Sequence, residues 1–305
     1  MGTPEFALPS LKTLIDMDLT VVGVFTQPDR PSGRGHKLES PPVKRLAQEH
    51  GIPVFQFERI RKQEGLDALR ALKPDLVVTA AFGQILSKKI LEVPRLGTIN
   101  VHASLLPRHR GAAPINWSII LGEKITGVTT MLTDVGLDTG DILLKTEVDI
   151  LPEGTAGELT ERLAIIGGEL LKTTVERYCA GELIPQKQDE ALMTYDPMMD
   201  KALGEIDWNK DAQTICNLVR GTNPWPGAYA LLGEEKLKLW RTSLSDAEPS
   251  ADIPVGGLFG DPKHGLFLRC TDGTLQILEL QAPGGKKLDG KTFLRGKNII
   301  GSVLS

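Results

Sequence analysis

The feature that most constrains the fold is a series of short apolar segments separated by helical segments over the first 184 residues. Leu19–Thr26 and Asp75–Phe82 are rich in apolar residues without polar alternation, which indicates strands buried on both faces. Between such segments, apolar residues recur at helical spacing. Alternating strands and helices predict an α/β domain with a doubly wound, mostly parallel sheet.

The boundaries of the expected elements follow from the same patterns. We expect helices at residues 4–17, 43–50, 62–72, 114–121 and 155–180. We expect strands at residues 19–26, 53–57, 75–82, 98–101, 126–135 and 142–150. Thr155, followed three residues later by Glu158, forms a capping-box pattern at the start of the longest helix. Gln27–Pro42 is a polar loop, long enough to indicate a functional role.

The start of the chain departs from the doubly wound pattern. The chain opens on Met1–Pro4, a glycine-containing loop that leads directly into a helix. In a doubly wound sheet, such a loop normally follows a first, central strand. We therefore expect the first strand to be missing because translation was assigned to start at an internal methionine. A truncated chain or a gap in the sheet are the alternatives.

A second domain is expected towards the C-terminus. Residues 185–205 are polar and irregular, as in a linker. Five short strands follow, at residues 228–232, 236–244, 256–259, 265–270 and 274–281. Short strands at this density are typical of a small β-barrel. The sequence thus predicts a catalytic domain at residues 1–184, a linker at 185–205 and a second domain at 206–305.

Composition limits the class of protein. The three cysteines of the 305-residue chain show no CxxC pairing, so a zinc site or disulfide framework is not expected, and a reducing cytoplasm fits best. No apolar run reaches the roughly 18–20 residues of a membrane helix. The net charge of −4 argues weakly against a nucleic-acid partner. Basic stretches near Arg34 and at residues 286–297 qualify this argument, although charge alone more often marks a solvated surface.

Three polar residues form the candidate catalytic group. Asn100 and His102 lie two residues apart on an expected strand, so their side chains share one face. Asp138 follows in a glycine-rich loop. A lone histidine is more often a core residue. An amide, an imidazole and a carboxylate together, however, can supply an oxyanion donor, an acid/base and an orienting charge for acyl transfer to an amine. His36, His50, His109 and His264 lack metal-ligand spacing and are expected to be surface or core residues.

At these positions the sequence resembles the formyltransferases that use 10-formyltetrahydrofolate. The segment Asn100-x-His102-x-Ser104-Leu105-Leu106-Pro107 and the downstream Asp138 match that family's active-site pattern residue for residue. Further segments resemble the family branch that acts on methionyl-tRNA. They are residues 25–35, 108–115, 136–141, 206–208 and 223–226. The resemblance runs over nearly the whole chain, and the missing first strand is its one clear departure.

The resemblance implies a function and a set of binding residues. The expected reaction transfers the formyl group of 10-formyltetrahydrofolate to the α-amine of methionyl-initiator tRNA, without a metal and by a monomer. The folate would bind along Ser104, Leu105, Leu106 and Pro107, with a cis bond between the last two. An OB-like C-terminal domain would bind tRNA. The expected tRNA contacts are Arg34, Lys286, Lys287, Lys291 and Arg295.

Three other interpretations remain open from the sequence. The chain could be a folate-dependent formyltransferase or hydrolase that acts on a small-molecule amine, since the active-site pattern specifies the chemistry and not the substrate. It could bind tRNA or folate without catalysis, although the complete catalytic group argues against this. It could also be an inactive fragment that lacks its first strand.

Overall fold

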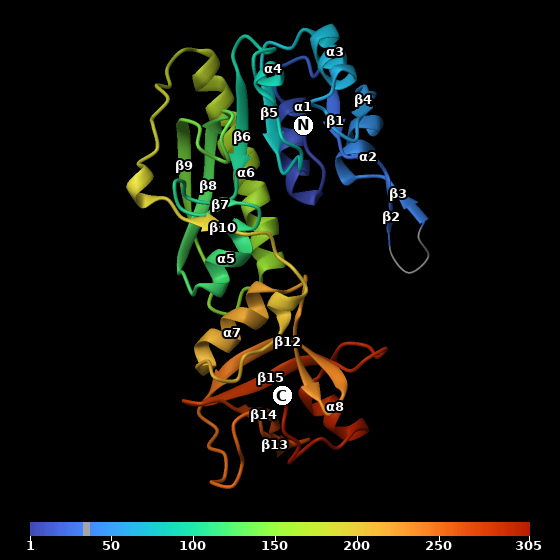
Figure 1. The fold of residues 1–305 in the computed structure, drawn as a ribbon, viewed down its shortest axis with the longest axis vertical. Helices are drawn as coiled ribbons and strands as arrows, with labels where there is room; N and C mark the ends of the chain where they lie inside the picture. Colours follow the sequence, from blue (N-terminus) through green and yellow to red (C-terminus); the bar gives the residue numbers. More distant parts are fainter. Residues whose placement is uncertain (33–36) are drawn as a thin grey trace. The chain divides into compact units, whose positions relative to one another are not determined.

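The computed structural model describes residues 1–32 and 37–305, which form two compact units (Figure 1). The first unit comprises Met1–Pro114, Ile125–Asp149 and Thr160–Asp196. The second unit comprises Ile115–Lys124, Ile150–Leu159 and Pro197–Ser305. The chain passes for the last time from the first unit to the second after Asp196, within the segment 185–205 that we expect to be a linker.

The main sheet of the first unit has four strands in the order β5-β6-β8-β9. They are β5 (Val77–Ala80), β6 (Thr98–His102), β8 (Ile125–Leu132) and β9 (Ile142–Asp149). β6 is parallel to β5 but antiparallel to β8, and β8 is antiparallel to β9. The expectation of a mostly parallel sheet is therefore wrong here. The loop of residues 133–141 joins β8 to β9 without the helical crossover that a parallel pair needs, so the two strands pair antiparallel.

A second, two-stranded sheet of the first unit is separated from β5 by the first residues of the chain. It pairs β1 (Val24–Thr26) with β4 (Val54–Gln56) in parallel. The Gly2 N–H donates to the Phe25 carbonyl, and the Ala80 N–H donates to the Met1 carbonyl, both at 3.0 Å. A cavity of about 540 Å³ continues from Met1 between β1 and β5. Its lining includes Leu11, Leu14, Val24, Leu69, Val77 and Val175. The sheet thus has a gap where a doubly wound fold has a central strand.

The α-amino group of Met1 gives a pH-dependent contribution to stability. It lies 2.7 Å from the Val78 carbonyl oxygen, and burial lowers the pKa of this amino group from 8.0 to about 5. Between these values the unfolded chain binds more protons than the folded chain, so the free energy of unfolding is expected to rise with pH from about 5 to 8 and then level off. The rise from this group is at most about 4 kcal/mol. Urea denaturation across this pH range measures it. The chain acetylated at its N-terminus should lack the step, and an identical rise in that chain would contradict the assignment to Met1.

Helices surround the sheets of the first unit. They are the short 3-10 helix η1 (Glu5–Ala7), α1 (Leu8–Asp16), α2 (Pro42–Glu49), α3 (Gln63–Leu72), α4 (Lys88–Leu91) and α6 (Ala156–Cys179). α6 approaches the sheet closely at Gly167, where an added Cβ would lie 3.0 Å from Val101 of β6. The expected capping box is confirmed, because the Thr155 N–H donates to the Glu158 carboxylate at 2.8 Å and the Glu158 N–H donates to the Thr155 hydroxyl at 3.3 Å.

The polar loop expected at residues 27–42 contains a short antiparallel ribbon. Its strands are β2 (Arg30–Ser32) and β3 (Lys37–Glu39). Asp29 anchors the base of the ribbon, since its carboxylate accepts from the Lys44 ammonium and from the Gln56 amide. These hydrogen bonds lower the pKa of the Asp29 carboxyl group. Arg34, the expected tRNA contact in this loop, lies outside the described residues.

The second unit is built around one antiparallel sheet. Its strands run in the order β11-β12-β15-β14-β13, with β16 paired to β15. They are β11 (Ala228–Leu232), β12 (Glu235–Ser245), β13 (Leu258–Asp261), β14 (Gly265–Arg269), β15 (Thr274–Gln281) and β16 (Leu288–Asp289). In the part of the chain that the structure describes, these strand pairings do not close into a barrel, so the expected small barrel is not confirmed.

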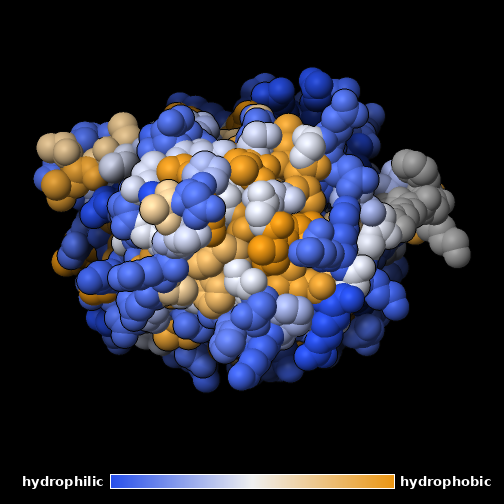
Figure 2. All heavy atoms as spheres, turned by 90° about the horizontal axis from the view of Figure 1, so that it is seen from below, coloured by the Kyte–Doolittle hydropathy of each residue, from blue (hydrophilic) through white to orange (hydrophobic). Residues whose placement is uncertain are grey.

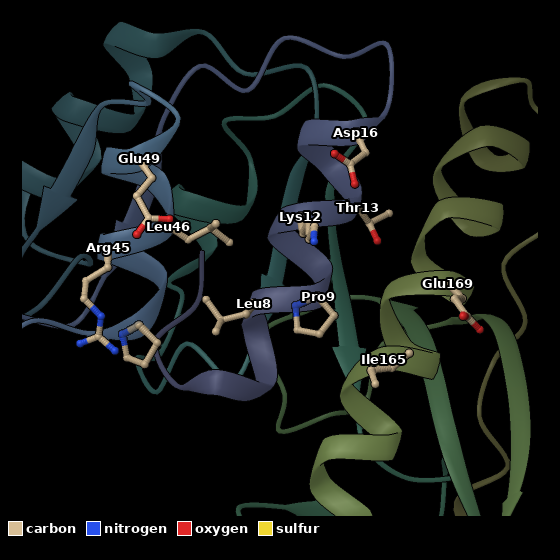
Figure 3. A pocket seen from close by; sticks show the side chains of 11 residues that line it. Leu8, Pro9, Lys12, Thr13, Asp16, Arg45, Leu46, Glu49, Ile165 and Glu169 are labelled. Carbon is tan, nitrogen blue, oxygen red and sulfur yellow. The ribbon is translucent and has the colours of Figure 1, made fainter.

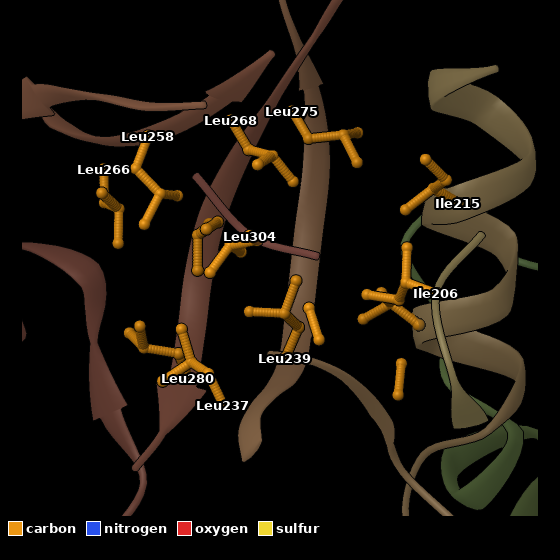
Figure 4. Close-up of a cluster of buried hydrophobic side chains, with 14 of the residues drawn as sticks. Ile206, Ile215, Leu237, Leu239, Leu258, Leu266, Leu268, Leu275, Leu280 and Leu304 are labelled. Carbon is orange, nitrogen blue, oxygen red and sulfur yellow. The ribbon is translucent and has the colours of Figure 1, made fainter. Parts of the chain in front are cut away.

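Leucine side chains from four strands form the core of the second unit (Figure 4). Leu239 and Leu275 are fully buried, and Ile215 of α7 (Ala212–Gly221) packs into the same cluster. The Asp211 carboxylate caps α7 by accepting from the Thr214 N–H at 2.8 Å.

The remaining elements of the two units are short. They are α5 (Pro114–Ile120), η2 (Glu190–Leu192), η3 (Ala202–Gly204), α8 (Gly290–Gly296) and the two-residue strands β7 (Arg110–Gly111) and β10 (Tyr195–Asp196).

Large apolar residues are exposed on both units. In the second unit, Val255, Ile300 and Val303 are more than one third exposed. Figure 2 shows apolar residues gathered in the middle of one face of the molecule and surrounded by hydrophilic residues. Among the described residues, no helix has both the length and the apolar character that crossing a membrane requires.

Candidate active site

Asn100 and His102 lie on the same face of β6, which runs between β5 and β8. The Thr79 hydroxyl, opposite Asn100 in the β5–β6 register, donates to the Asn100 Oδ1 at 2.8 Å. This bond orients the amide, because an oxygen that accepts from a hydroxyl leaves the Nδ2 hydrogens for other acceptors. Asn100 is half-buried, so its Nδ2 can serve as a donor to a substrate oxygen.

His102 is buried and has two different partners. Its Nε2 lies 2.9 Å from the His109 carbonyl oxygen, and its Nδ1 lies 3.8 Å from the Asp138 Oδ1. A carbonyl oxygen only accepts hydrogen bonds, so Nε2 carries a proton. Nδ1 is therefore the nitrogen through which neutral His102 can take up a proton. The carboxylate of Asp138 is placed to stabilise the imidazolium that results.

Asp138 is held in the loop between β8 and β9 by an unusual backbone conformation. Its φ is +54°, in the left-handed region that non-glycine residues rarely adopt. The Asp138 Oδ2 accepts from the Gly111 N–H at 2.9 Å, which turns Oδ1 towards His102. The structure therefore brings together the three candidate catalytic residues of the sequence.

The Ser104–Pro107 segment follows β6 shortly after His102, and hydrogen bonds to β8 hold it in place. The Thr129 hydroxyl donates to the Ser104 carbonyl at 2.6 Å and accepts from the Leu106 N–H at 3.1 Å. The Leu106–Pro107 bond is cis, as the resemblance implies. The Lys145 ammonium donates to the Leu106 carbonyl, and burial lowers the pKa of Lys145. Ser104, Leu106 and Pro107 are buried, so within this segment only the half-buried Leu105 is partly exposed to a ligand.

Gln188 holds the Asp138 loop, and no pattern in the sequence indicates this role. The Gln188 Nε2 donates to the Asp138 carbonyl at 2.7 Å and to the Gly140 carbonyl at 2.8 Å. The Gln188 Oε1 accepts from the buried guanidinium of Arg110 at 2.8 Å. The Arg110 guanidinium also forms a bidentate ion pair with the Glu190 carboxylate, with N–O distances of 2.7 and 3.0 Å. These hydrogen bonds lower the pKa of Glu190. Gln188 and Glu190 lie in the segment 185–205, whose polar composition indicates only a linker.

The expected tRNA contacts of the C-terminal region lie on the surface of the second unit. Lys286, Lys287, Lys291 and Arg295 are all exposed. Lys291 and Arg295 belong to α8, whereas Lys286 and Lys287 precede β16. The Lys287 ammonium lies 3.6 Å from the centroid of the Trp240 ring, a cation–π distance.

Two cavities of the first unit lie apart from the catalytic candidates. The first is the gap between β1 and β5. The second, of about 600 Å³, is open and lies among α1, α2 and α6 (Figure 3). Leu8, Leu46 and Ile165 supply its apolar lining, and charged residues of both signs surround them. Asn100, His102 and Asp138 line neither cavity.

The arrangement at the end of β6 is suited to acyl transfer. The amide N–H of Asn100, the Nδ1 of His102 and the neighbouring carboxylate of Asp138 can stabilise an oxyanion and move a proton. The groups come from backbone segments that hydrogen bonds fix on several sides. Such preorganised donors lower the barrier because they need no reorganisation during the reaction.

Comparison with known proteins identifies the family. Residues 1–175 match the family described as "Formyl transferase", and residues 198–298 match "Formyl transferase, C-terminal domain". The chain is 51% identical over 299 residues to the "Methionyl-tRNA formyltransferase" of Ruminiclostridium cellulolyticum, which covers 98% of this chain and 96% of that protein. It is also 51% identical to the protein of the same name from Citrifermentans bemidjiense, over 98% of this chain and 93% of that protein.

Solved structures share the fold. The N-formyltransferase from Helicobacter canadensis, crystallised with folinic acid and dTDP-3-aminofucose, has a TM-score of 0.66 at 18% identity. This match covers 94% of this chain and 97% of that chain. The methionyl-tRNA formyltransferase from Clostridium thermocellum has a TM-score of 0.51 at 21% identity, over 68% of this chain and 88% of that chain. Since the family models and the full-length relatives agree, this protein belongs to the formyl transferase family.

Proposed function

We propose that this enzyme transfers the formyl group of 10-formyltetrahydrofolate to the α-amino group of methionyl-initiator tRNA. The observation that carries the proposal is the meeting of Asn100, His102 and Asp138 at one end of β6, in a chain half identical to methionyl-tRNA formyltransferases over nearly its full length. We further propose that it acts in the cytoplasm as a monomer, with the folate bound along Ser104–Pro107.

The mechanism follows from the hydrogen bonds at the site. The neutral amine attacks the formyl carbon, an N–C bond forms, and the carbonyl electron pair moves to the oxygen. His102 Nδ1 takes up the proton of the attacking amine, and Asn100 Nδ2 and the resulting protonated Nδ1 stabilise the oxyanion. Asp138 supports this imidazolium until Nδ1 passes the proton to the folate nitrogen. The oxyanion then reforms the carbonyl as the bond to the folate nitrogen breaks.

Formylation of methionyl-initiator tRNA by the 305-residue chain tests the proposal. The assay contains 10-formyltetrahydrofolate and follows formyl-methionyl-tRNA, with free methionine and an aminosugar nucleotide as parallel acceptors. Turnover with the tRNA alone is the expected result. Turnover only with a small amine would overturn the tRNA assignment and support the alternative reading. Binding of tRNA and folate without turnover on any acceptor would instead indicate a binding protein.

The second unit supplies a basic surface for the tRNA in this proposal. Lys286, Lys287, Lys291 and Arg295 are exposed, and phosphate contacts from such residues give affinity without sequence selection. We also propose that the sheet is completed into an OB-like barrel by the end of the chain. The Ser305 N–H donates to Leu231 of β11 at 3.0 Å, and the Leu304 N–H donates to Gly256 beside β13 at 2.8 Å, so residues 304–305 contact both sides of the opening.

The double variant Lys291→Ala/Arg295→Ala is expected to weaken tRNA binding without slowing the catalytic step. The KM for tRNA should rise while kcat stays near that of the parent. The slope of log KM against log salt should fall by about two, since each lost phosphate contact removes about one. Steady-state kinetics over a salt series measures both. Lys88→Ala/Lys89→Ala, which removes two exposed charges from α4, is the matched control. Equal salt slopes in the two variants would remove α8 from the tRNA surface.

Gln188→Leu is expected to lower kcat by about 10- to 100-fold. The substitution keeps the size of the side chain but removes both donors to the Asp138 loop, so the carboxylate is no longer held against His102. A misplacement of about 1 Å at a reacting group can cost this much. Steady-state kinetics measures the effect. Gln186→Leu, at an exposed position of the same segment, is the control and should leave kcat unchanged. A Gln188 variant with parental kcat would show that the loop holds Asp138 without the Gln188 amide.

A further inference from the structure

A buried histidine–aspartate pair includes His109, whose own carbonyl group contacts the catalytic His102. The His109 Nδ1 is 2.8 Å from the Asp196 Oδ2, and the two side chains are only 3% and 5% exposed. His109 has a φ of +59°, so its backbone adopts the left-handed region that non-glycine residues usually avoid. Strained backbone of this kind persists only where surrounding contacts fix it. The pair with Asp196 is one such contact.

The backbone on either side of the His109 side chain contacts both catalytic side chains. The His109 carbonyl accepts from the His102 Nε2 at 2.9 Å. Two residues later, the Gly111 N–H donates to the Asp138 Oδ2 at 2.9 Å. The segment 109–111 therefore determines which nitrogen of His102 is protonated and how the Asp138 carboxylate is oriented.

The same segment is bound to residues 194–196. The His109 N–H donates to the Thr194 hydroxyl at 2.7 Å, and the Arg110 N–H donates to the Thr194 carbonyl at 2.9 Å. β7 and β10 pair in parallel, with Gly111 opposite Asp196. There is no room for a side chain at Gly111, where a Cβ would lie 2.3 Å from the Asp196 carbonyl oxygen. The contact between the His109 and Asp196 side chains thus adds to the backbone hydrogen bonds that join these two segments.

We propose that His109 and Asp196 are positioning residues for formyl transfer, which hold segment 109–111 so that its carbonyl and N–H groups meet His102 and Asp138. The inference rests on the proposed function. Neither side chain touches the reacting atoms in this proposal. Their contribution passes through the backbone of residues 109 and 111, and it should therefore be seen in kcat and in the state of the His102 ring.

The first test replaces one member of the pair. Asp196→Leu, which removes the acceptor, is expected to lower kcat by about 10- to 100-fold and to change the KM for folate and tRNA by less than about threefold. Asp196→Asn keeps an acceptor for His109 and should recover most of kcat. Asp261→Asn is the matched control, since it alters a similar His–Asp contact, with 2.7 Å to His264, on an exposed part of the second unit. Parental kcat in Asp196→Leu would overturn the proposal.

A double variant separates positioning from stability. His109→Gly removes the ring but suits the positive φ, so it also serves if Asp196→Leu fails to fold. Removing one member of a buried pair is more destabilising than removing both. In His109→Gly/Asp196→Leu, Tm is therefore expected to recover relative to Asp196→Leu while kcat stays low. Recovery of kcat together with Tm would show that the pair is only structural.

A spectroscopic measurement tests the geometry without relying on the reaction. With ¹⁵N-labelled histidine, neutral His102 in the parent chain should show a protonated Nε2 and an unprotonated Nδ1. In Asp196→Leu the ¹⁵N chemical shifts of the two His102 ring nitrogens should move towards a common average. The reason is that the His109 carbonyl no longer holds the proton on Nε2. An unchanged His102 spectrum would overturn the proposal. If the parent chain formylates no tRNA but the shift occurs, the proposed function fails while the positioning contact stands.

Discussion

Replacement of His102 by alanine is expected to lower kcat for tRNA formylation by about 10²- to 10⁴-fold, the usual contribution of a general acid/base. The Nε2 proton is committed to the His109 carbonyl, so the chemistry depends on Nδ1, 3.8 Å from Asp138. The alanine variant loses the proton carrier and one donor to the oxyanion. Its folate affinity should change little, because the folate is proposed to bind along Ser104–Pro107.

Single-turnover kinetics at saturating folate and tRNA measures this loss separately from binding. His264→Ala, at an exposed histidine of the second unit, is the control and should retain the parental rate. His102→Gln keeps a polar side chain but cannot take up a proton, and it should be nearly as slow as the alanine variant. A His102→Ala variant within about tenfold of the parent would remove this residue from proton transfer.

Replacement of Asn100 by alanine is expected to lower kcat by about 10²- to 10³-fold, the usual cost of removing one oxyanion donor. Thr79 fixes the amide by donating to Oδ1 at 2.8 Å, which leaves Nδ2 for the substrate oxygen. The effect should fall on kcat and kcat/KM to the same extent, since the interaction strengthens only as the oxyanion develops.

Thr79→Val is the matched variant for Asn100. It keeps the shape of the β5 side chain and removes only the donor that orients the amide. We expect a smaller loss of kcat than in Asn100→Ala, because the amide remains but rotates more freely. The same single-turnover assay compares the two. If Asn100→Ala raises KM and leaves kcat unchanged, Asn100 binds the substrate and does not stabilise the oxyanion.

Local patterns in the sequence predicted most elements of the fold. The strand over β15 and the helix over α3 lie close to their expected positions, because apolar periodicity and turn residues act over a few neighbours. The capping box at Thr155 and the shared face of Asn100 and His102 follow from spacing alone. The relative direction of neighbouring strands could not be predicted from these local patterns. The antiparallel pairing of β8 depends on how the chain returns to the sheet.

The sequence by itself determined which side chains share the face of β6, and it identified Asp138 as the carboxylate to look for. Only the tertiary structure decided which nitrogen of His102 is protonated and which oxygen of Asp138 faces it, since the His109 carbonyl and the Gly111 N–H make these choices. Gln188 and Asp196, which contact the Asp138 loop and His109, belong to a segment that the sequence predicts to be a linker. Spacing along a strand is fixed by local backbone geometry, whereas such contacts between distant segments depend on how the whole chain packs.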